Sequence, residues 1–202
     1  TNGGTNWLNI NGQGLAITQF WGIGGKRDNP DFIAGGTQDN SMQIYNNNVW
    51  NQAGSGDVGN IVYDYFDQNK CYYMHSGGGQ GYVTNINHPD NGLFFFFWNM
   101  ISNQHGLFTG VRNLYKSTNH GANWTNLTNF SNPDNHEIRD FDFSEYNPNI
   151  IYLGMKHPTW NPVLQKKLYL CTNATNASPI WTDITANLGD AIHWAGILDV
   201  AI

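Results

Sequence analysis

Short apolar runs alternate along this chain with clusters of Asn, Gly, Asp and Pro. The runs Ile61–Tyr65, Phe94–Trp98 and Ile150–Leu153 consist mainly of β-branched and aromatic residues, which is typical of short β-strands. The polar clusters between such runs contain the residues that favour turns. No long window shows apolar residues at helical spacing. The pattern therefore predicts an all-β chain of many short strands.

One polar cluster has a defined order, S-T-N-H-G-A-N-W at Ser117–Trp124. In a hairpin turn, Asn119 and Ser117 can hydrogen-bond the backbone of the turn. Gly121 can take a positive φ at little cost, and Trp124 can fold its apolar face over the turn. We expect Ser117, Asn119, Gly121 and Trp124 to hold this turn and to touch no substrate.

The same order recurs at two other places. Near the start of the chain, Asn2, Gly4 and Trp7 repeat it without the serine. A worn copy runs from Cys171 to Trp181, with cysteine in the serine position and a longer turn. A motif that recurs indicates a repeated structural unit before it indicates chemistry.

A second recurring signal is a turn followed by an apolar strand, as at Asn29-Pro30 and Asn147-Pro148, with a weaker copy at Asp67–Lys70. Pro30 and Lys70 are about 40 residues apart, and Lys70 and Pro148 are about 80 residues apart. The segment Phe94–Trp124 supplies the poorly marked unit that this spacing requires between Lys70 and Pro148. A unit of this length with three or four short strands matches a four-stranded propeller blade. The sequence therefore predicts a β-propeller fold with about four antiparallel blade units.

Composition and net charge limit the classes of partner that are expected. The net charge is −6 with nine Lys and Arg residues, which argues against nucleic acid or an anionic membrane surface as the main partner. No stretch approaches the length of an apolar membrane span, so membrane insertion is not expected. Cys71 and Cys171 lie in different repeats. Two free thiols within strands are the favoured reading, and a disulfide is the alternative.

The S-x-[DN]-x-G-x-x-W order of Ser117–Trp124 resembles the Asp-box, or BNR, repeat of sialidase-like and sortilin/Vps10-like β-propellers. Gly35–Asn40 and Gly54–Gly59 resemble segments of large secreted propeller proteins of Bacteroidota-type bacteria. Those chains often carry a sorting domain for the type 9 secretion system. The resemblance implies an extracellular or cell-surface propeller. It leaves the function open, because Asp-box propellers include hydrolases, receptors, assembly factors and scaffolds.

Residues 1–202 are expected to form a single β-propeller region of a longer chain. The resembling propellers usually close with roughly six to eight blades. Four units alone would leave open sheet edges, which favour association with other strands. We therefore expect the remaining blades of the parent chain, or another chain, as partners at these edges.

Two carboxylates are candidates for catalysis, because glycosidases use paired acids as acid and base. Asp57 and Asp39 both lie in Gly-rich loops, where propellers display functional groups. Ser55–Gly59 also resembles the Gly-Asp-[Ile/Val]-Gly segment that carries a catalytic Asp in xyloglucanase-like propeller hydrolases. The structural alternative is that Asp in such turns caps backbone amides. The sequence leaves both readings open.

Other chemistry is less well supported. The three arginines are scattered, and the seven histidines lack ligand spacing, so neither a sialidase arginine cluster nor a metal site is expected. Ser76–Gly81 lacks the Lys-Ser/Thr end of a phosphate-binding loop. No cofactor is expected. Trp160, in a loop-like segment with Pro and Asn, is the best candidate for stacking on a sugar ring.

The sequence favours a secreted or cell-surface propeller that binds a glycan or a protein through its loops. One alternative is a glycoside hydrolase of the xyloglucanase-like propeller type, with Asp57, and less so Asp39, as acid or base. The other is a structural part of a large surface or secreted assembly.

Overall fold

The computed structural model describes residues 5, 18–54, 56–77, 80–83, 99–128, 130–132, 135–144, 146–156 and 166–188. These residues form short strands and one 3-10 helix. No helix among them is long and apolar enough to cross a membrane. The bounds are β1 Phe20–Gly25, β2 Ile33–Thr37, β3 Met42–Asn46, β4 Val49–Ala53, β5 Asp57–Tyr63, β6 Cys71–Gly77, β7 Gln80–Val83, β8 Met100–Asn103, β9 Gly106–Gly110, β10 Leu114–Ser117, β11 Thr125–Asn126, β12 Glu137–Phe143, β13 Ile151–Lys156, β14 Lys166–Cys171, β15 Trp181–Asp183 and η1 Thr185–Leu188.

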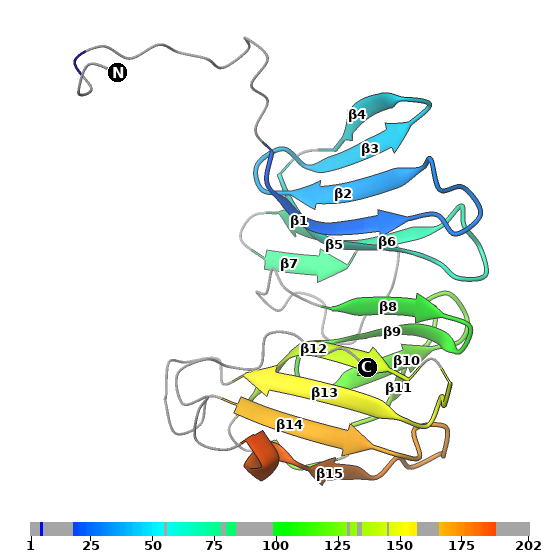
Figure 1. The fold of residues 1–202 in the computed structure, drawn as a ribbon, viewed down its shortest axis with the longest axis vertical. Helices are drawn as coiled ribbons and strands as arrows, with labels where there is room; N and C mark the ends of the chain where they lie inside the picture. The colour runs from blue at the N-terminus through cyan, green and yellow to red at the C-terminus, as the bar shows by residue number, and fades with distance from the viewer. Residues whose placement is uncertain are drawn as a thin grey trace.

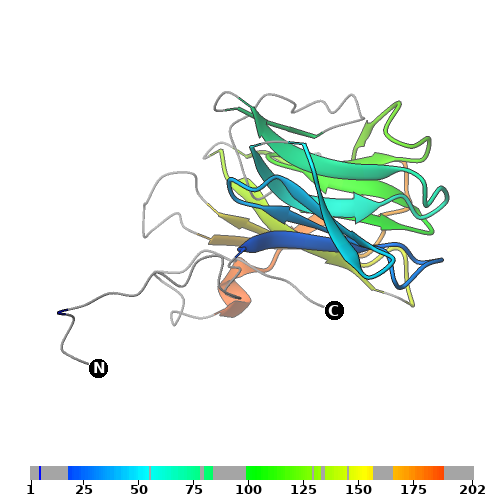
Figure 2. The same cartoon turned by 90° about the horizontal axis from the view of Figure 1, so that it is seen from above.

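The strands form four antiparallel sheets in chain order, here called blades 1 to 4: β1–β4, β5–β7, β8–β11 and β12–β15. Figure 1 shows the sheets one above another, from blade 1 at the top to blade 4 at the bottom. The view from above (Figure 2) shows their strands overlapping in one stack. Blades 1, 3 and 4 have four strands, and blade 2 has three among the described residues. The prediction of an all-β chain with about four blade units is confirmed.

The first strand of each blade, here called its inner strand (β1, β5, β8 and β12), lies beside the first strand of the next. Asn60 in β5 donates a hydrogen bond to Asn99 Oδ1, just before β8, at 3.3 Å. Asn99 in turn donates to Asp140 Oδ1 in β12. The ladder register shifts at this level in three of these inner strands, including between Val58 and Ile61 and between Ile138 and Asp140. A chain of polar side chains therefore ties blades 2, 3 and 4 together along their inner strands.

The apolar core lies between the blades. Ala34 and Met42 of blade 1 pack on Val58 and Ile61 of blade 2. A second cluster joins blade 2 to blade 3, and a third joins blade 3 to blade 4. Because a single sheet has little core of its own, burial of these side chains holds neighbouring blades together.

The loop after the inner strand has the same hydrogen bonds in three blades. In blade 1, Lys26 N donates to Phe32 O at 3.2 Å and Phe32 N donates to Asn29 O at 3.1 Å. The corresponding donors and acceptors are separated by the same numbers of residues in the loops 64–70 and 144–150. These loops are the second recurring signal of the sequence, and the copy at Asp67–Lys70 forms the same turn without proline.

Inner strands of adjacent blades run parallel, so the molecule has two distinct ends. At the Asp57 end the inner strands begin, and the β2–β3 loop lies there too. At the Tyr65 end the inner strands terminate, and the loops 26–32, 64–70 and 144–150 lie there. Strands β1 and β8 point toward the Tyr65 end, which is on the right in Figure 1.

Candidate functional site

Asp39 and Asp57 meet at the Asp57 end, although they come from different blades. Asp57 is the first residue of β5, and its Oδ1 accepts a hydrogen bond of 2.7 Å from the backbone N–H of Asp39. Ser41 N donates to Gly56 O at 2.9 Å, and Asn40 forms a bridge with Gly56. The Gly-rich loops that the sequence singled out therefore lie directly against each other.

This contact gives Asp57 a structural task. Asp39 and Ser41 both have positive φ angles, of 63° and 61°, a backbone conformation that costs free energy for residues other than glycine. The Asp57 carboxylate holds the amide of the first of them in place. The second oxygen of this carboxylate, Oδ2, is not part of this bond.

The Ser117–Trp124 turn connects β10 to β11 and is held by hydrogen bonds of its own side chains. Ser117 Oγ accepts hydrogen bonds from the amides of Asn119, at 3.3 Å, and Gly121, at 2.8 Å. Asn119 Oδ1 accepts from Ser117 Oγ at 3.0 Å and from Asn123 N at 2.9 Å. Gly121 has a φ of 79°. Trp124 is half-buried against the apolar cluster between blades 2 and 3.

The worn copy at Cys171–Trp181 has the same arrangement. Asn173 Oδ1 accepts from Cys171 Sγ at 3.4 Å and from Ile180 N at 2.8 Å, so Asn173 corresponds to Asn119. Trp181 packs on the cluster between blades 3 and 4 and donates from Nε1 to Leu127 O at 2.8 Å. The other predicted positions, Asn2, Gly4, Trp7 and Trp160, lie outside the described residues.

A buried carboxylate that the sequence analysis did not single out lies between blades 2 and 3. Asp64 is 3% exposed and follows β5 directly. Its Oδ1 accepts from the amides of Phe66 and Asp67, at 2.8 and 2.9 Å. Its Oδ2 accepts from Tyr72 Oη at 2.6 Å and contacts His120 Nδ1 at 2.9 Å. The turn of blade 3 is thereby attached to the loop of blade 2.

The ionised form of Asp64 is favoured in this position. Burial raises the pKa of the Asp64 carboxyl, but the hydrogen bonds from Tyr72, His120 and the amides of Asp67 and Phe66 outweigh burial and hold the pKa below its ordinary value. Burial, together with the bond to Asp64, raises the pKa of the Tyr72 hydroxyl. His120, in the variable position of the turn, therefore bonds a buried anion while its side chain stays 39% exposed.

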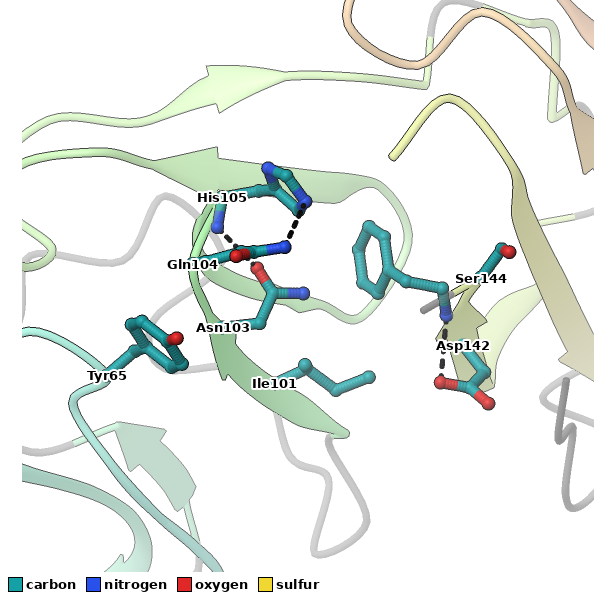
Figure 3. A pocket seen from close by; sticks show the side chains of 8 residues that line it. Tyr65, Ile101, Asn103, Gln104, His105, Asp142 and Ser144 are labelled. Atoms are coloured by element: carbon teal, nitrogen blue, oxygen red, sulfur yellow. Dashed lines mark hydrogen bonds between the residues drawn. The ribbon is translucent and has the colours of Figure 1, made fainter. Parts of the chain in front are cut away.

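A cavity of about 390 Å³ opens at the Tyr65 end between blades 2, 3 and 4. We call it the Asn103 cavity. In Figure 3, Tyr65 lies on one side, Asp142 and Ser144 lie on the other, and Asn103 lies between them. The described residues of the wall provide two aromatic rings, two side-chain amides, an imidazole, two hydroxyls, a carboxylate and an aliphatic side chain: Tyr65, Ile101, Asn103, Gln104, His105, Asp142, Phe143 and Ser144.

Several groups of this wall are held by local hydrogen bonds. Asn103 Oδ1 accepts from the amide of His105 at 2.8 Å, and Gln104 Nε2 lies 3.3 Å from His105 Nε2. Asp142 Oδ1 accepts from Phe143 N at 2.8 Å. A carboxylate, two amides and an imidazole provide both donors and acceptors, which suits a ligand with several hydroxyl groups.

The sequence analysis missed this cavity. Its residues come from three blades and form no motif, and Asp142 lies inside an ordinary strand pattern. Asp39 and Asp57, which the Gly-rich loops did indicate, lie at the opposite end of the inner strands. A usable signal existed only in the recurrence of the loop after the inner strand, which identifies Tyr65 and Ser144 as loop residues at one end.

Neither thiol chemistry nor a metal centre emerges from the described residues. Cys71 and Cys171 are free thiols, and burial raises the pKa of each, which makes a thiol a poorer nucleophile. No group of three or more His, Cys, Asp or Glu side chains within the described ranges is arranged to hold a metal ion.

Scans against protein-family models and against curated proteins found no match. Solved structures did match. The crystal structure of a GH74 xyloglucanase from Xanthomonas campestris has a TM-score of 0.59 at 10% sequence identity, covering 80% of this chain and 29% of that one. The crystal structure of an ancestral GH74 enzyme has a TM-score of 0.60 at 17% identity, covering 83% of this chain and 26% of that one.

Identities this low carry the fold alone. This chain spans less than a third of the length of either enzyme. Together with the four stacked antiparallel sheets, the likeness shows that the described residues form consecutive blades of a β-propeller. The narrower resemblance to Asp-box and sortilin-like propellers stays a prediction.

Proposed function

We propose that this propeller region is a non-catalytic glycan-binding module of a secreted or cell-surface protein, with the Asn103 cavity as its binding site. The observation that carries the proposal is the composition of that cavity. Its aromatic and amide side chains can contact a sugar ring and its hydroxyl groups, whereas Asp142 is the single carboxylate among the described residues of its wall. Glycoside hydrolysis ordinarily needs two carboxylates across the scissile bond. Because one of the GH74 enzymes that share the fold is a xyloglucanase, xyloglucan oligosaccharides are the first ligands to test.

The test is binding of neutral oligosaccharides, first on a glycan array and then by calorimetry. Gln104→Ala removes an exposed amide at the cavity, and Gln52→Ala removes an exposed amide on β4 as a matched control. We expect the first variant to weaken binding by about tenfold and the second to leave it unchanged, because a lost hydrogen bond costs about 1 kcal/mol or somewhat more. Equal binding by both variants, or no binding to any neutral glycan, would overturn the proposal.

Hydrolysis is the second candidate, and the meeting of Asp39 with Asp57 from two blades favours it. In this reading Asp57 is the acid or base, and its partner carboxylate is Asp39 or lies in a further blade. Release of reducing ends from xyloglucan by the purified protein, abolished by Asp57→Asn, would support hydrolysis and exclude the non-catalytic reading. Intact xyloglucan after prolonged incubation would exclude the hydrolase hypothesis.

A further inference from the structure

A second cavity, of about 320 Å³, lies at the Tyr65 end where β1, β5 and β8 meet. We call it the Arg27 cavity. It shares Tyr65 with the Asn103 cavity, so the two adjoin. Its wall contains the Arg27 guanidinium, the amides of Asn60 and Asn99, and the Ser102 hydroxyl. None of the described residues that line it is an Asp or a Glu.

Arg27 is held in a fixed position by blade 2. Its guanidinium carbon lies 4.0 Å from the centre of the Tyr65 ring, and its Nη2 donates to Tyr65 O at 3.2 Å. Its backbone N–H donates to Gln68 Oε1 at 2.6 Å. Tyr65 is itself fixed from blade 3, because its N–H donates to Ser102 Oγ at 2.8 Å. A stacked guanidinium keeps its planar edge for a ligand and loses little conformational freedom on binding.

The charges around this cavity favour an anion. Among the described residues Arg27 forms no ion pair with a carboxylate. Asp64 precedes Tyr65 of the wall and Asp140 bonds Asn99 of the wall, and both carboxylates accept hydrogen bonds from protein groups. Asp28 and Asp67 are the chain neighbours of the lining residues Arg27 and Gln68. A second cation is close, since Lys26 Nζ lies 5.7 Å from the centre of the Tyr63 ring, which lines the cavity.

We propose that the Arg27 cavity binds the carboxylate of an acidic sugar unit, a uronic acid, in the glycan whose neighbouring unit occupies the Asn103 cavity. This proposal rests on the proposed glycan-binding function and adds a substrate class to it. A guanidinium edge matches a carboxylate with two parallel hydrogen bonds. The amides of Asn60 and Asn99 and the Ser102 hydroxyl can face the ring hydroxyls. The volume is at the lower end for ligand pockets, which suits one sugar unit.

The test compares trigalacturonic acid with its fully methyl-esterified form, which has the same rings and no charge. Calorimetry measures both ligands on the unmodified protein, on Arg27→Gln and on Arg112→Gln. Arg112 is an exposed arginine in the β9–β10 loop at the other end of the blades, so its variant matches the change in net charge. We expect Arg27→Gln to weaken binding of the acid by about tenfold or more and to leave the ester unchanged, because charge-assisted hydrogen bonds are lost. Arg112→Gln should affect neither ligand.

Other outcomes decide against the proposal. Equal affinity for acid and ester, or no effect of Arg27→Gln on the acid, overturns the acidic-sugar site even if Gln104→Ala still weakens neutral glycans, in which case the proposed function stands. Displacement of trigalacturonic acid by an equal concentration of inorganic phosphate would show a general anion site and also overturn it. A selective loss in Arg27→Gln with no effect of Gln104→Ala would support the Arg27 cavity and remove the Asn103 cavity as the binding site.

Discussion

Asp64 accepts three hydrogen bonds from its own blade 2 and one from His120 of blade 3. Its two oxygens accept from two backbone amides, from Tyr72 and from His120. In Asp64→Asn one oxygen becomes an amide nitrogen of nearly the same size, which donates hydrogen bonds and leaves at least one buried donor unmatched. We expect the free energy of unfolding to fall by about 1–3 kcal/mol, measured by urea denaturation.

Two further variants separate this effect from a general loss of charge. Asp31→Asn removes the charge of an exposed carboxylate in the loop of blade 1 and should change stability by no more than about 0.5 kcal/mol. His120→Ala removes the partially exposed partner and should cost less than Asp64→Asn, because water can replace an exposed donor. If Asp64→Asn were as stable as Asp31→Asn, the stabilising role assigned to the hydrogen bonds of Asp64 would be wrong.

The pH dependence follows from the direction of the Asp64 pKa. Since hydrogen bonds hold this pKa below its ordinary value, the ionised form stabilises the folded protein. The contribution is complete above the unfolded-state pKa of about 4 and is lost as the pH falls through the lower folded-state pKa. The stability difference between the unmodified protein and Asp64→Asn should therefore be full at pH 5 and shrink below about pH 4. Denaturation at several acid pH values measures it, and a difference that grows on acidification would contradict the assignment.

At the scale of single elements, side chains of the Ser117–Trp124 turn make the stabilising hydrogen bonds that backbone groups make in a two-residue hairpin. Ser117 is 2% exposed, and its hydroxyl accepts from two amides and donates to Asn119. In Ser117→Ala those amides lose their acceptor inside the protein. We expect a loss of about 1–3 kcal/mol in unfolding free energy, measured by thermal or urea denaturation.

Thr118→Ala is the matched control, since Thr118 has the neighbouring hydroxyl in the same turn and is exposed. It should change stability by no more than about 0.5 kcal/mol. Equal effects of the two substitutions would mean that the turn is held by its backbone alone. Binding of glycans should be unchanged in both variants, because the turn lines neither the Asn103 cavity nor the Arg27 cavity.

Local elements were the part of the fold that the sequence could predict. Short strands, the loops at Asn29-Pro30 and Asn147-Pro148 and the copy at Cys171–Trp181 all follow from residues close together in the chain. Even the copy without proline, Asp67–Lys70, forms the expected turn. Turn chemistry depends on side chains that bond their own backbone, and such bonds are visible in a short stretch of sequence.

At the scale of the whole molecule, the sequence could not show which loops come together. Asp39 and Asp57 could be picked out by their Gly-rich surroundings, but the hydrogen bond between them depends on how blade 1 stacks on blade 2. Asp64 looked like part of a strand, and its bond to His120 spans two blades. Both cavities at the Tyr65 end are lined from three blades. Their chemistry is therefore set by stacking, which a local pattern does not encode.

That stacking depends on close backbone approach, which gives a last prediction. A Cβ at Gly36 would lie 2.0 Å from Gly59 O and 2.5 Å from Val58 O, so blade 1 could not keep its present distance from blade 2. At Gly25, in the same sheet, the nearest atom to an added Cβ would be Phe32 O at 3.9 Å. Alanine limits the unfolded chain equally at both positions, so a comparison of the two isolates the contact between the blades.

We expect Gly36→Ala to lower the free energy of unfolding by about 1–3 kcal/mol or more, and Gly25→Ala to leave it nearly unchanged. Urea denaturation followed by tryptophan fluorescence measures both. Because Trp50 lies in blade 1 and Trp181 in blade 4, a blade 1 that separates early should also broaden the transition of Gly36→Ala, as in other repeat proteins with weakened interfaces between units.

If Gly36→Ala does not fold while Gly25→Ala does, the contact is required for the fold. Equal stability of the two variants would show that the stack of blades tolerates a wider spacing, and the cavities shared by three blades would then have no fixed shape.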